Sequence, residues 1–364
     1  MRIRKKKEKD PYHLLAETLR RIPQGFNIDE GGVWLKVLKW IFNPEEAKLA
    51  SQMKLISETP KKMASRLKLD VEYLDKILKV MDKKGQIIEY KSSDGIKYGL
   101  MPFVVGIYEE QLDRMDADFA ALMEEYFKVT GYSDLFDTEP EIFKIVPVNK
   151  VIPVETSIFP YQQAEEIVKK AKSWGIRDCI CKLQQELIGN ECSYSKNVCL
   201  TFSKRENAYD DSTISKPINL NQALQVLKDA EEEGLIHSSM NVSQGHNYIC
   251  NCCTCCCGVM RSMVEFGQTR AFAKSDYEIE INEDECIACE VCVDRCQFNA
   301  LTVDEVCHVD LDKCVGCGVC AVVCDVGAMK LVPRKKIKKP TRNIITWMLK
   351  KAWKRKVNPY RVFR

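Results

Sequence analysis

Eight cysteines in the C-terminal part of the sequence repeat one spacing. Two runs of C-x2-C-x2-C-x3-C begin 28 residues apart and comprise Cys286, Cys289, Cys292 and Cys296, then Cys314, Cys317, Cys320 and Cys324. A C-x2-C-x2-C loop can bring three soft thiolates to the corners of a [4Fe-4S] cluster, and a more distant cysteine supplies the fourth. The doubled pattern therefore predicts two iron-sulfur clusters and one-electron chemistry.

The segment that carries these runs, residues 277–333, resembles the bacterial two-cluster ferredoxin domain. In that family the last cysteine of each run binds the cluster of the other run. The resemblance implies one cluster on Cys286, Cys289, Cys292 and Cys324, and a second on Cys314, Cys317, Cys320 and Cys296. Gln297 and Asp325 depart from the family, which usually has proline there. The alternative is two structural zinc sites, but the doubled spacing favours iron-sulfur clusters.

The two loops differ in their small residues. The second loop has Gly316 and Gly318, which suit a backbone that turns tightly and presents amides to sulfur. The first loop has Ala288 and Glu290 at the same positions. We therefore expect the two clusters to differ in reduction potential.

Ten further cysteines lie upstream, between residues 179 and 257. They are Cys179, Cys181, Cys192, Cys199, Cys250, Cys252, Cys253, Cys255, Cys256 and Cys257. Neighbouring residues of an extended chain point to opposite faces, so Cys252/Cys253 and Cys255/Cys256 are not expected to present every sulfur to one ion. The ten thiols could ligate one or two further iron-sulfur clusters or zinc, or include reactive thiols; iron-sulfur clusters are favoured.

Several short motifs extend the resemblance to about residues 20–333. Those in the cysteine-rich middle are residues 187–192 (LIGNEC), 198–200 (VCL), 232–237 (EEGLIH) and 249–253 (ICNCC), and residues 102–109 (PFVVGIYE) lie upstream. They are similar to those of a family of iron-sulfur proteins from anaerobic bacteria and archaea. The resemblance implies a winged-helix-like N-terminal region, a cysteine-rich middle domain, a two-cluster ferredoxin domain and electron transfer, with no substrate specified.

The remaining candidate side chains are isolated in the sequence. Cys307 lies between the ferredoxin runs, where a buried thiol is favoured over a ligand. His13, His237, His246 and His308 are too scattered to form a site by spacing. His246, four residues before Cys250, is the one candidate for a cluster or proton-transfer residue.

Composition indicates a reducing environment. The 364 residues are enough for two to four domains, and the nineteen cysteines follow no secretory signal. Free thiols persist where disulfides are reduced, so we expect a cytoplasmic protein of an anaerobic organism. No stretch reaches the roughly 20 apolar residues of a membrane-spanning helix.

Charge is distributed unevenly along the chain. Residues 1–9 and 334–364 together carry nineteen Lys/Arg and one acid, so the remaining chain is acidic although the net charge is +3. An acidic body favours a basic redox partner, and basic termini favour an anionic surface.

The N-terminal third reads as three helices and a hairpin. Asn43-Pro44-Glu45-Glu46 is typical of a capped helix start, and Thr59-Pro60 opens two further helical segments that end at Gly85. Two strand-like runs then flank Asp94-Gly95. This order resembles a winged helix. Residues 71–84 mix acids with lysines, so protein docking is favoured and nucleic acid is disfavoured as a partner.

The sequence predicts an α+β, multidomain chain. We expect a basic N-terminal tail (1–30), a helical winged-helix-like domain (31–135), a linker and helix (136–175), a cysteine-rich iron-sulfur domain (176–270), the ferredoxin domain (277–333) and a basic tail (334–364). Further helices are expected at residues 113–128, 161–174 and 221–233, the last two ending at Gly175 and Gly234.

The C-terminal tail reads as an amphipathic helix. Residues 341–357 place Ile344, Ile345, Met348, Leu349 and Ala352 on one face, with Trp347 and Trp353 at its margins and Lys/Arg around it. Such a helix could lie on the inner face of an anionic membrane or in a groove of a partner subunit; a disordered tail attracted to nucleic acid is less favoured.

Three functions are compatible with these features. The leading hypothesis is electron transfer between redox partner proteins through at least two [4Fe-4S] clusters. A reductase with a catalytic cluster or reactive thiols in the middle domain, and a redox-sensing DNA-binding regulator, are the alternatives. The sequence has no nucleotide-binding glycine loop or catalytic triad, so a role as an electron-transfer component is favoured over a stand-alone enzyme.

Overall fold

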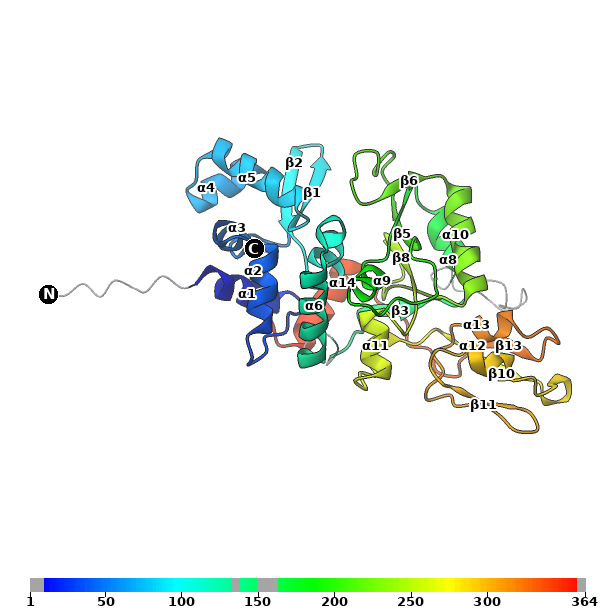
Figure 1. Ribbon diagram of the computed structural model, residues 1–364. Helices are drawn as coiled ribbons and strands as arrows, with labels where there is room; N and C mark the ends of the chain where they lie inside the picture. The colour runs from blue at the N-terminus through cyan, green and yellow to red at the C-terminus, as the bar shows by residue number, and fades with distance from the viewer. Residues whose placement is uncertain (1–9, 132–135, 137, 149–162, 359–364) are drawn as a thin grey trace. The chain divides into compact units, whose positions relative to one another are not determined.

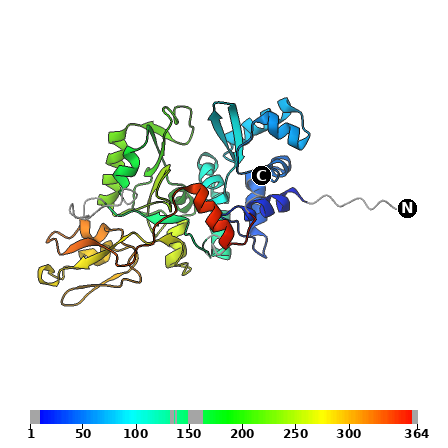
Figure 2. The ribbon, with the colours of Figure 1, turned by 180° about the vertical axis from the view of Figure 1, so that it is seen from behind.

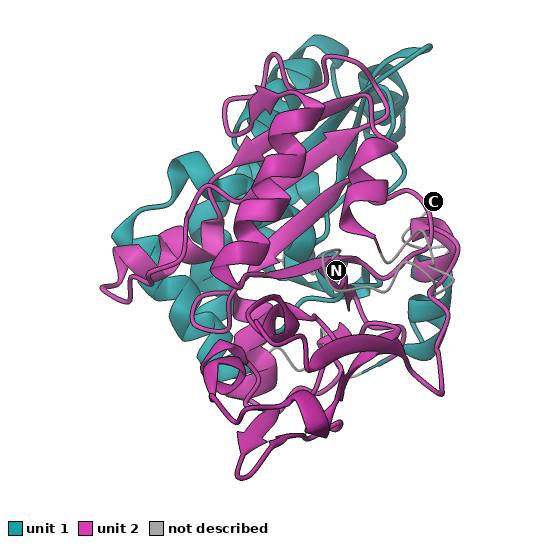
Figure 3. Cartoon of the chain, turned by 90° about the vertical axis from the view of Figure 1, so that its right-hand side faces the viewer, with its two compact units in different colours: residues 1–138, 348–364 teal, residues 139–347 magenta. Residues whose placement is uncertain are grey.

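The computed structural model describes residues 10–131, 136, 138–148 and 163–358 (Figure 1). The chain divides into two compact units, which Figure 3 colours separately. Unit 1 comprises residues 1–138 and 348–364, and unit 2 comprises residues 139–347. The mixture of helix and sheet agrees with the predicted α+β class.

Unit 1 begins with helices and contains one hairpin. Its elements are α1 (Pro11–Arg21), α2 (Val33–Ile41), α3 (Pro44–Ala50), α4 (Pro60–Leu67), α5 (Val71–Lys83), β1 (Ile87–Ser92), β2 (Gly95–Leu100), the irregular η1 (Phe103–Ile107), η2 (Glu109–Arg114) and α6 (Ala117–Thr130). The predicted order of α3, α4, α5 and a hairpin is present; its identification as a winged helix stays a prediction.

The helix starts of unit 1 follow from capping. The side chains of Asn43 and Glu46 each accept a hydrogen bond from the other's backbone N–H, as the sequence predicted. The side chain of Thr59 caps α4 by accepting from Lys62 N–H. Residues 11–21 form α1, whose buried Leu15 and Leu19 belong to the core, so a tail spanning residues 1–30 was wrong for that stretch. Residues 1–9 lie outside the described residues.

Aromatic packing holds α6 against α2. The rings of Trp40 and Phe119 stack with centroids 3.8 Å apart, and the Tyr126 hydroxyl donates to the backbone oxygen of Asn27 at 3.0 Å. On the exposed side of α5, Lys79 pairs with Asp75 at 2.7 Å. A role of α5 in protein docking rather than in nucleic-acid binding stays a prediction.

The carboxyl group of Asp82 makes unit 1 sensitive to pH. It accepts a hydrogen bond from Glu89 N–H at 2.8 Å, and burial raises the pKa of Asp82 to about 6. A folded-state pKa above the unfolded value means that this group contributes less to stability as pH rises from about 4 to about 6.

Asp82→Asn should therefore stabilise unit 1 above pH 6. The amide keeps the acceptor for Glu89 N–H and removes the partly buried charge, so we expect the free energy of unfolding to rise by about 1 kcal/mol at pH 8 and to stay unchanged at pH 3. Urea unfolding at the two pH values measures this. An equal change in the free energy of unfolding at pH 8 and at pH 3 would contradict the raised pKa of Asp82.

The first part of unit 2 is built around a mixed sheet. Its elements are β3 (Phe143–Ile145), α8 (Ala164–Lys169), β4 (Ser173–Arg177), α9 (Ile180–Leu187), β5 (Cys199–Ser203), β6 (Lys216–Ile218), α10 (Leu220–Glu233), β7 (Ile236–Met240), β8 (Tyr248–Cys252), α11 (Gly258–Val264) and β9 (Phe272–Ala273). The seven strands lie in the order β6-β4-β5-β8-β7-β3-β9; β3 and β9 run parallel and the other neighbours antiparallel.

Helices α8 and α10 supply the apolar side chains that cover this sheet. Ala164, Ile167, Ala223 and Leu227 share one buried cluster with sheet residues such as Leu200. The predicted helix at 221–233 is confirmed as α10, because the Asn219 side chain caps it and Gly234 ends it in a left-handed conformation.

The helix expected at residues 161–174 was wrong in its C-terminal part. Helix α8 covers only Ala164–Lys169, and residues 173–177 form the sheet strand β4. Within the segment expected to be a linker, residues 143–145 are extended and pair in the sheet as β3. Gly175 does not stop a helix. A Cβ atom there would lie 3.0 Å from Thr201 Oγ1 and from the Tyr209 ring, so glycine permits close approach within the sheet. Residues 149–162 lie outside the described residues.

The second part of unit 2 carries the two cysteine runs. Its elements are β10 (Tyr277–Ile281), η5 (Glu283–Glu285), α12 (Val291–Arg295), β11 (Leu301–Val303), β12 (Cys307–Val309), α13 (Val319–Val322) and β13 (Met329–Pro333). Strands β10 and β13 pair antiparallel, and β11 and β12 form a hairpin. Each cysteine loop precedes a short helix, so the two halves repeat one pattern.

This part is joined to the large sheet by buried polar contacts. Lys144 of β3 pairs with Asp276 at 2.9 Å, and both side chains are almost fully buried. The backbone N–H of Val148 donates to the carbonyl of Cys317 at 2.9 Å. The second cysteine loop is therefore fixed to the segment that follows β3.

Helix α14 (Ile344–Lys354), red in Figure 2, forms within the predicted range 341–357. Trp347, which the sequence placed at the margin of the apolar face, is fully buried and donates its indole N–H to Glu141 O at 2.9 Å. Lys351 is also buried and donates to the carbonyl of Thr138. Ile345 and Leu349, two residues of the predicted apolar face, are exposed, and their contact with a membrane or a partner stays a prediction.

Candidate metal centres

The eight ferredoxin cysteines surround two separate cavities. Cys286, Cys289, Cys292 and Cys324 line the first cavity. Cys296, Cys314, Cys317 and Cys320 line the second. Each cavity therefore takes three thiols from one run and one from the other, the same grouping that the ferredoxin resemblance implied.

Left-handed backbone at two positions turns each loop. In the second loop Gly316 and Gly318 have φ of 71° and 83°, and in the first loop Ala288 and Glu290 have φ of 52° and 61°. A Cβ atom on Gly316 would lie 1.9 Å from the carbonyl oxygen of Tyr277. Glycine is thus required at residue 316, whereas the first loop accepts side chains at a conformational cost.

The donor sets fit [4Fe-4S] clusters. Each cavity offers the four thiols of one ferredoxin quartet, and Cys307 also lines the first cavity. Backbone N–H groups already point at sulfur: Cys307 N–H donates to Cys286 Sγ and Ala300 N–H to Cys296 Sγ, both at 3.4 Å. Burial raises the pKa of the Cys317 thiol to about 12, so that thiol is protonated at neutral pH until a cation binds.

Cys307 is buried beside the first cavity. It is 3% exposed, and its Sγ lies 3.6 Å from Cys292 Sγ. Burial raises the pKa of Cys307 to about 12. The prediction of a buried thiol is confirmed; its role as a non-ligand stays a prediction.

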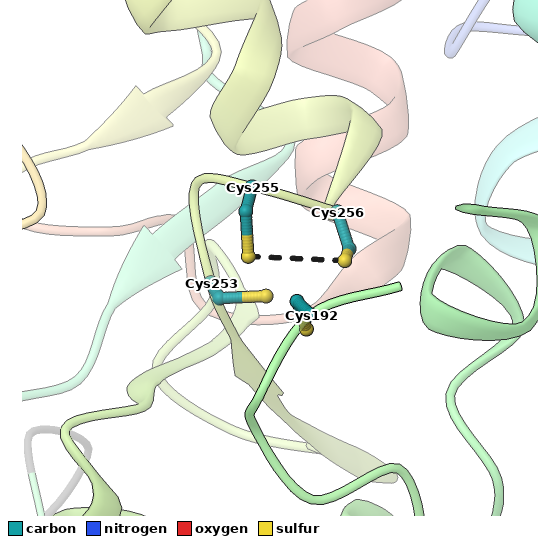
Figure 4. A group of neighbouring side chains, drawn as sticks. All are labelled: Cys192, Cys253, Cys255 and Cys256. Atoms are coloured by element: carbon teal, nitrogen blue, oxygen red, sulfur yellow. Dashed lines mark hydrogen bonds between the residues drawn. The ribbon is translucent and has the colours of Figure 1, made fainter. Parts of the chain in front are cut away.

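The ten upstream cysteines separate into two groups. Cys192, Cys253, Cys255 and Cys256 form the four-thiol group, whose Sγ atoms all lie within 4.8 Å of one another (Figure 4). Three of them follow β8 in one turn, and Cys192 comes from the loop after α9. Cys253 and Cys256 are buried, Cys192 is half-buried and Cys255 is exposed. These side chains converge on one point from two segments of the chain.

The other six upstream thiols form a hydrogen-bonded chain, here called the six-thiol group. In order of contact they are Cys179, Cys181, Cys257, Cys252, Cys250 and Cys199. Cys179 and Cys257 directly precede α9 and α11, and Cys181 lies in α9. The remaining three lie in β8 and at the start of β5. The hydrogen bond of Cys179 to Cys181, together with burial, raises the pKa of the Cys179 thiol. The six thiols therefore cannot all ionise without a bound cation.

The prediction about adjacent cysteines was right in one place and wrong in another. Cys252 ends β8 and belongs to the six-thiol group, whereas Cys253 belongs to the four-thiol group, as expected for an extended chain. Cys255 and Cys256 belong to the same group, with their Sγ atoms 3.8 Å apart. Residues 254–256 form a turn, so the alternation of an extended chain does not apply there.

His237 supports the six-thiol group, although its place in the sequence gave no sign of this. It is fully buried; its Nδ1 lies 2.6 Å from Asn251 Oδ1, and its Nε2 lies 3.2 Å from Glu231 Oε1. Asn251 stands between Cys250 and Cys252 and donates to Val198 O at 2.6 Å, next to Cys199. This network fixes the two strands that carry three of the thiols.

His246 does not join either thiol group through a described contact. Its Nδ1 pairs with the hydroxyl of Ser239 at 2.9 Å, and burial lowers the pKa of His246 to about 4. The imidazole is therefore neutral at physiological pH. A role in cluster binding or proton transfer stays a prediction without support from a described contact.

Gln297, the residue that replaces the family's proline, joins the ferredoxin part to the four-thiol group. Its Oε1 accepts a hydrogen bond from Thr254 N–H at 2.8 Å, and its Nε2 donates to Gly234 O at 2.6 Å. Thr254 lies between Cys253 and Cys255, and Gln297 follows Cys296 of the second cavity. Proline could make neither contact, which accounts for the departure.

Arg295 makes further contacts between the ferredoxin part and the cysteine-rich part of unit 2. Its guanidinium donates to the backbone oxygens of Glu231, Glu232 and Glu233 at the C-terminal end of α10, at 3.0 Å for Glu231 and 2.8 Å for Glu233. A cation at this end of a helix also complements the partial negative charge there. The last turn of α10 is thus fixed beside the second ferredoxin run.

Comparison with known proteins agrees with the ferredoxin part of this arrangement. A family model described as a 4Fe-4S binding domain matches residues 279–302 and 308–330. The searches against curated proteins and against solved structures found no match. The chain therefore contains two consecutive 4Fe-4S binding repeats, which hold two [4Fe-4S] clusters and give it the capacity for one-electron transfer.

Proposed function

We propose that this protein is an electron-transfer component that passes single electrons between redox partner proteins of anaerobic metabolism. The pairing of two cysteine-lined cavities with a matching 4Fe-4S domain carries this proposal. The eight ferredoxin cysteines are the proposed ligands, three from one run and one from the other in each cluster. All nineteen cysteines are free, which suits a reducing compartment.

The six-thiol group is the proposed place of one further iron-sulfur cluster. Six partly or fully buried thiols exceed the four ligands of a single ion, and they contact one another in a chain rather than around one point. A polynuclear cluster spreads its ligands in this way. The relay would then extend from the ferredoxin part into the large sheet of unit 2.

The rim of the first cavity is the proposed contact with a partner. Cys289 is exposed there, and Ile287 and Val326, which line the same cavity, are 66% and 42% exposed. Glu290 also lines the cavity and is exposed, and the exposed Asp325 precedes Val326 in the sequence. An apolar patch with an acidic rim fits a redox protein whose own centre is surrounded by lysine or arginine.

Spectroscopy on anaerobically purified protein tests the proposed function. Two ferredoxin clusters and one in the six-thiol group predict about twelve irons per chain, with reduction potentials within the wide range of iron-sulfur proteins. EPR-monitored titration with reduced viologen should show each cluster accepting one electron. Protein that holds its iron but cannot exchange electrons with any low-potential carrier would contradict the proposal.

The exposed side of α14 is a candidate for peripheral contact with an anionic membrane. Ile345, Leu349 and Trp353 are 60%, 46% and 73% exposed and, spaced by four residues, lie on one face of the helix. Lys350 and Lys354 are exposed beside them. In the part of the chain that the structure describes, no helix is long and apolar enough to span a bilayer.

Trp353→Ser should weaken binding to vesicles that contain anionic lipid by about tenfold at low salt, because one large apolar side chain no longer enters the interface. Co-sedimentation measures this, and added salt should reduce binding of both proteins. Val80→Ser, which changes an exposed side chain on α5, is the matched control and should bind normally. Equal binding of Trp353→Ser and the unaltered chain would exclude the membrane role.

A further inference from the structure

We propose that the four-thiol group binds a single tetrahedral metal ion, Zn²⁺ or one iron, rather than another [4Fe-4S] cluster. This goes beyond the proposed electron-transfer function and does not depend on it. The argument rests on the spacing of four sulfur atoms and on the position of the turn that carries three of them.

The sulfur spacing fits one ion. Metal–sulfur bonds of ~2.3 Å in a tetrahedron give sulfur–sulfur edges of ~3.8 Å. The Sγ atoms of Cys255 and Cys256 lie 3.8 Å apart, and all four Sγ atoms of the group lie within 4.8 Å of one another. Small side-chain shifts would complete the tetrahedron.

The ferredoxin quartets provide an internal comparison. Among the described residues, no other set of three or more thiols, imidazoles and carboxylates is as compact as the four-thiol group. The two ferredoxin quartets, which hold four-iron clusters, are therefore wider. A cluster of the same size does not fit the four-thiol group without moving its ligands apart.

The donor set also fits a closed, structural site. Four thiolates complete the tetrahedral coordination of Zn²⁺ and leave no position for substrate. Cys192 and Cys253 are far apart in the sequence, so an ion here would fasten the loop after α9 to the turn after β8. A backbone hydrogen bond also stabilises that turn, because Cys257 N–H donates to Cys253 O at 3.1 Å.

The position of the ion gives it a role. Thr254 lies between two of the ligands, and its N–H donates to Gln297 Oε1 at 2.8 Å. Gln297 is the neighbour of Cys296, which lines the second ferredoxin cavity. The ion would fix the turn at residues 254–256, which the ferredoxin part contacts through Gln297. It would thereby fix the distance between the second cavity and the cysteine-rich sheet.

Metal analysis of the unaltered protein is the first test. Zinc and iron are quantified after anaerobic purification, and X-ray absorption at the zinc edge should show four sulfur neighbours at ~2.3 Å with no metal–metal distance. If iron occupies the site, Mössbauer spectra should show one tetrahedral thiolate-bound iron beside the clusters. Absence of both signatures would overturn the proposal.

Single substitutions provide the second test. Cys192→Ser and Cys256→Ser should each lose one equivalent of zinc or iron while the EPR signals of the two ferredoxin clusters remain. Thr254→Ser, which changes a residue within the same turn and removes no ligand, should keep the ion. Loss of about four irons from either cysteine variant would identify a [4Fe-4S] cluster instead, and unchanged metal content would also overturn the proposal.

Discussion

Gly316→Ala should remove about four irons per chain, because the second ferredoxin loop can no longer close around its cluster. The added Cβ would lie 1.9 Å from the carbonyl oxygen of Tyr277 in β10, and the residue has a φ of 71°. Backbone cannot move aside as the end of a flexible side chain can. Iron and acid-labile sulfide analysis measures the loss, and EPR should retain the signal of the first cluster.

Ala288→Gly is the matched control for this change. Residue 288 occupies the equivalent place in the first loop, with a φ of 52°, so removing its Cβ relieves strain. This variant should keep the full iron content. An unchanged iron content in Gly316→Ala would show that the loop and β10 separate easily. The close approach of residue 316 to Tyr277 would then not be needed for cluster binding.

The ion pair between Lys144 and Asp276 should give the largest change in stability. Both side chains are almost fully buried, and Lys144 Nζ also donates to Lys274 O at 3.0 Å. Lys144→Met removes the ammonium group that faces the buried Asp276 carboxylate, so we expect the free energy of unfolding to fall by about 3–5 kcal/mol. Asp276→Leu should cost a similar amount.

The double variant separates two contributions to the free energy of unfolding: the stabilisation from the ion pair and the destabilisation that follows when one of the two charges is removed. Lys144→Met with Asp276→Leu buries two apolar side chains and no charge, so it should be more stable than either single variant. Chemical unfolding of the cluster-loaded protein measures all four members of the cycle. Additive losses would show that the two side chains do not interact.

The sequence was most informative where chemistry depends on local spacing. The grouping of the eight ferredoxin cysteines around two cavities follows from one repeated loop and the known exchange of ligands between its copies. Asn43 likewise predicted the start of α3, because a capping side chain acts within one turn of its own position.

Features that depend on tertiary contacts were not predictable in the same way. The division of the ten upstream thiols depends on a turn at residues 254–256 and on Cys192 arriving from another segment. Trp347 was placed at the margin of an amphipathic helix, but its partner, the carbonyl of Glu141, is distant in the sequence. In the sequence, Gln297 stood out only because the ferredoxin family usually has proline at that position. Its contacts with Thr254 and Gly234, which proline could not make, explain the difference.

The interleaving of the two ferredoxin runs also bears on how the protein is made. The first cavity lacks its fourth thiol until Cys324 has been synthesised, and the second needs Cys320, so a ribosome must reach almost the end of this domain before either quartet exists. The four-thiol group is complete much sooner, at Cys256. Maturation can therefore proceed from the proposed upstream metal site to the ferredoxin clusters, and a truncated chain that ends between Cys256 and Cys320 would carry neither ferredoxin quartet in full.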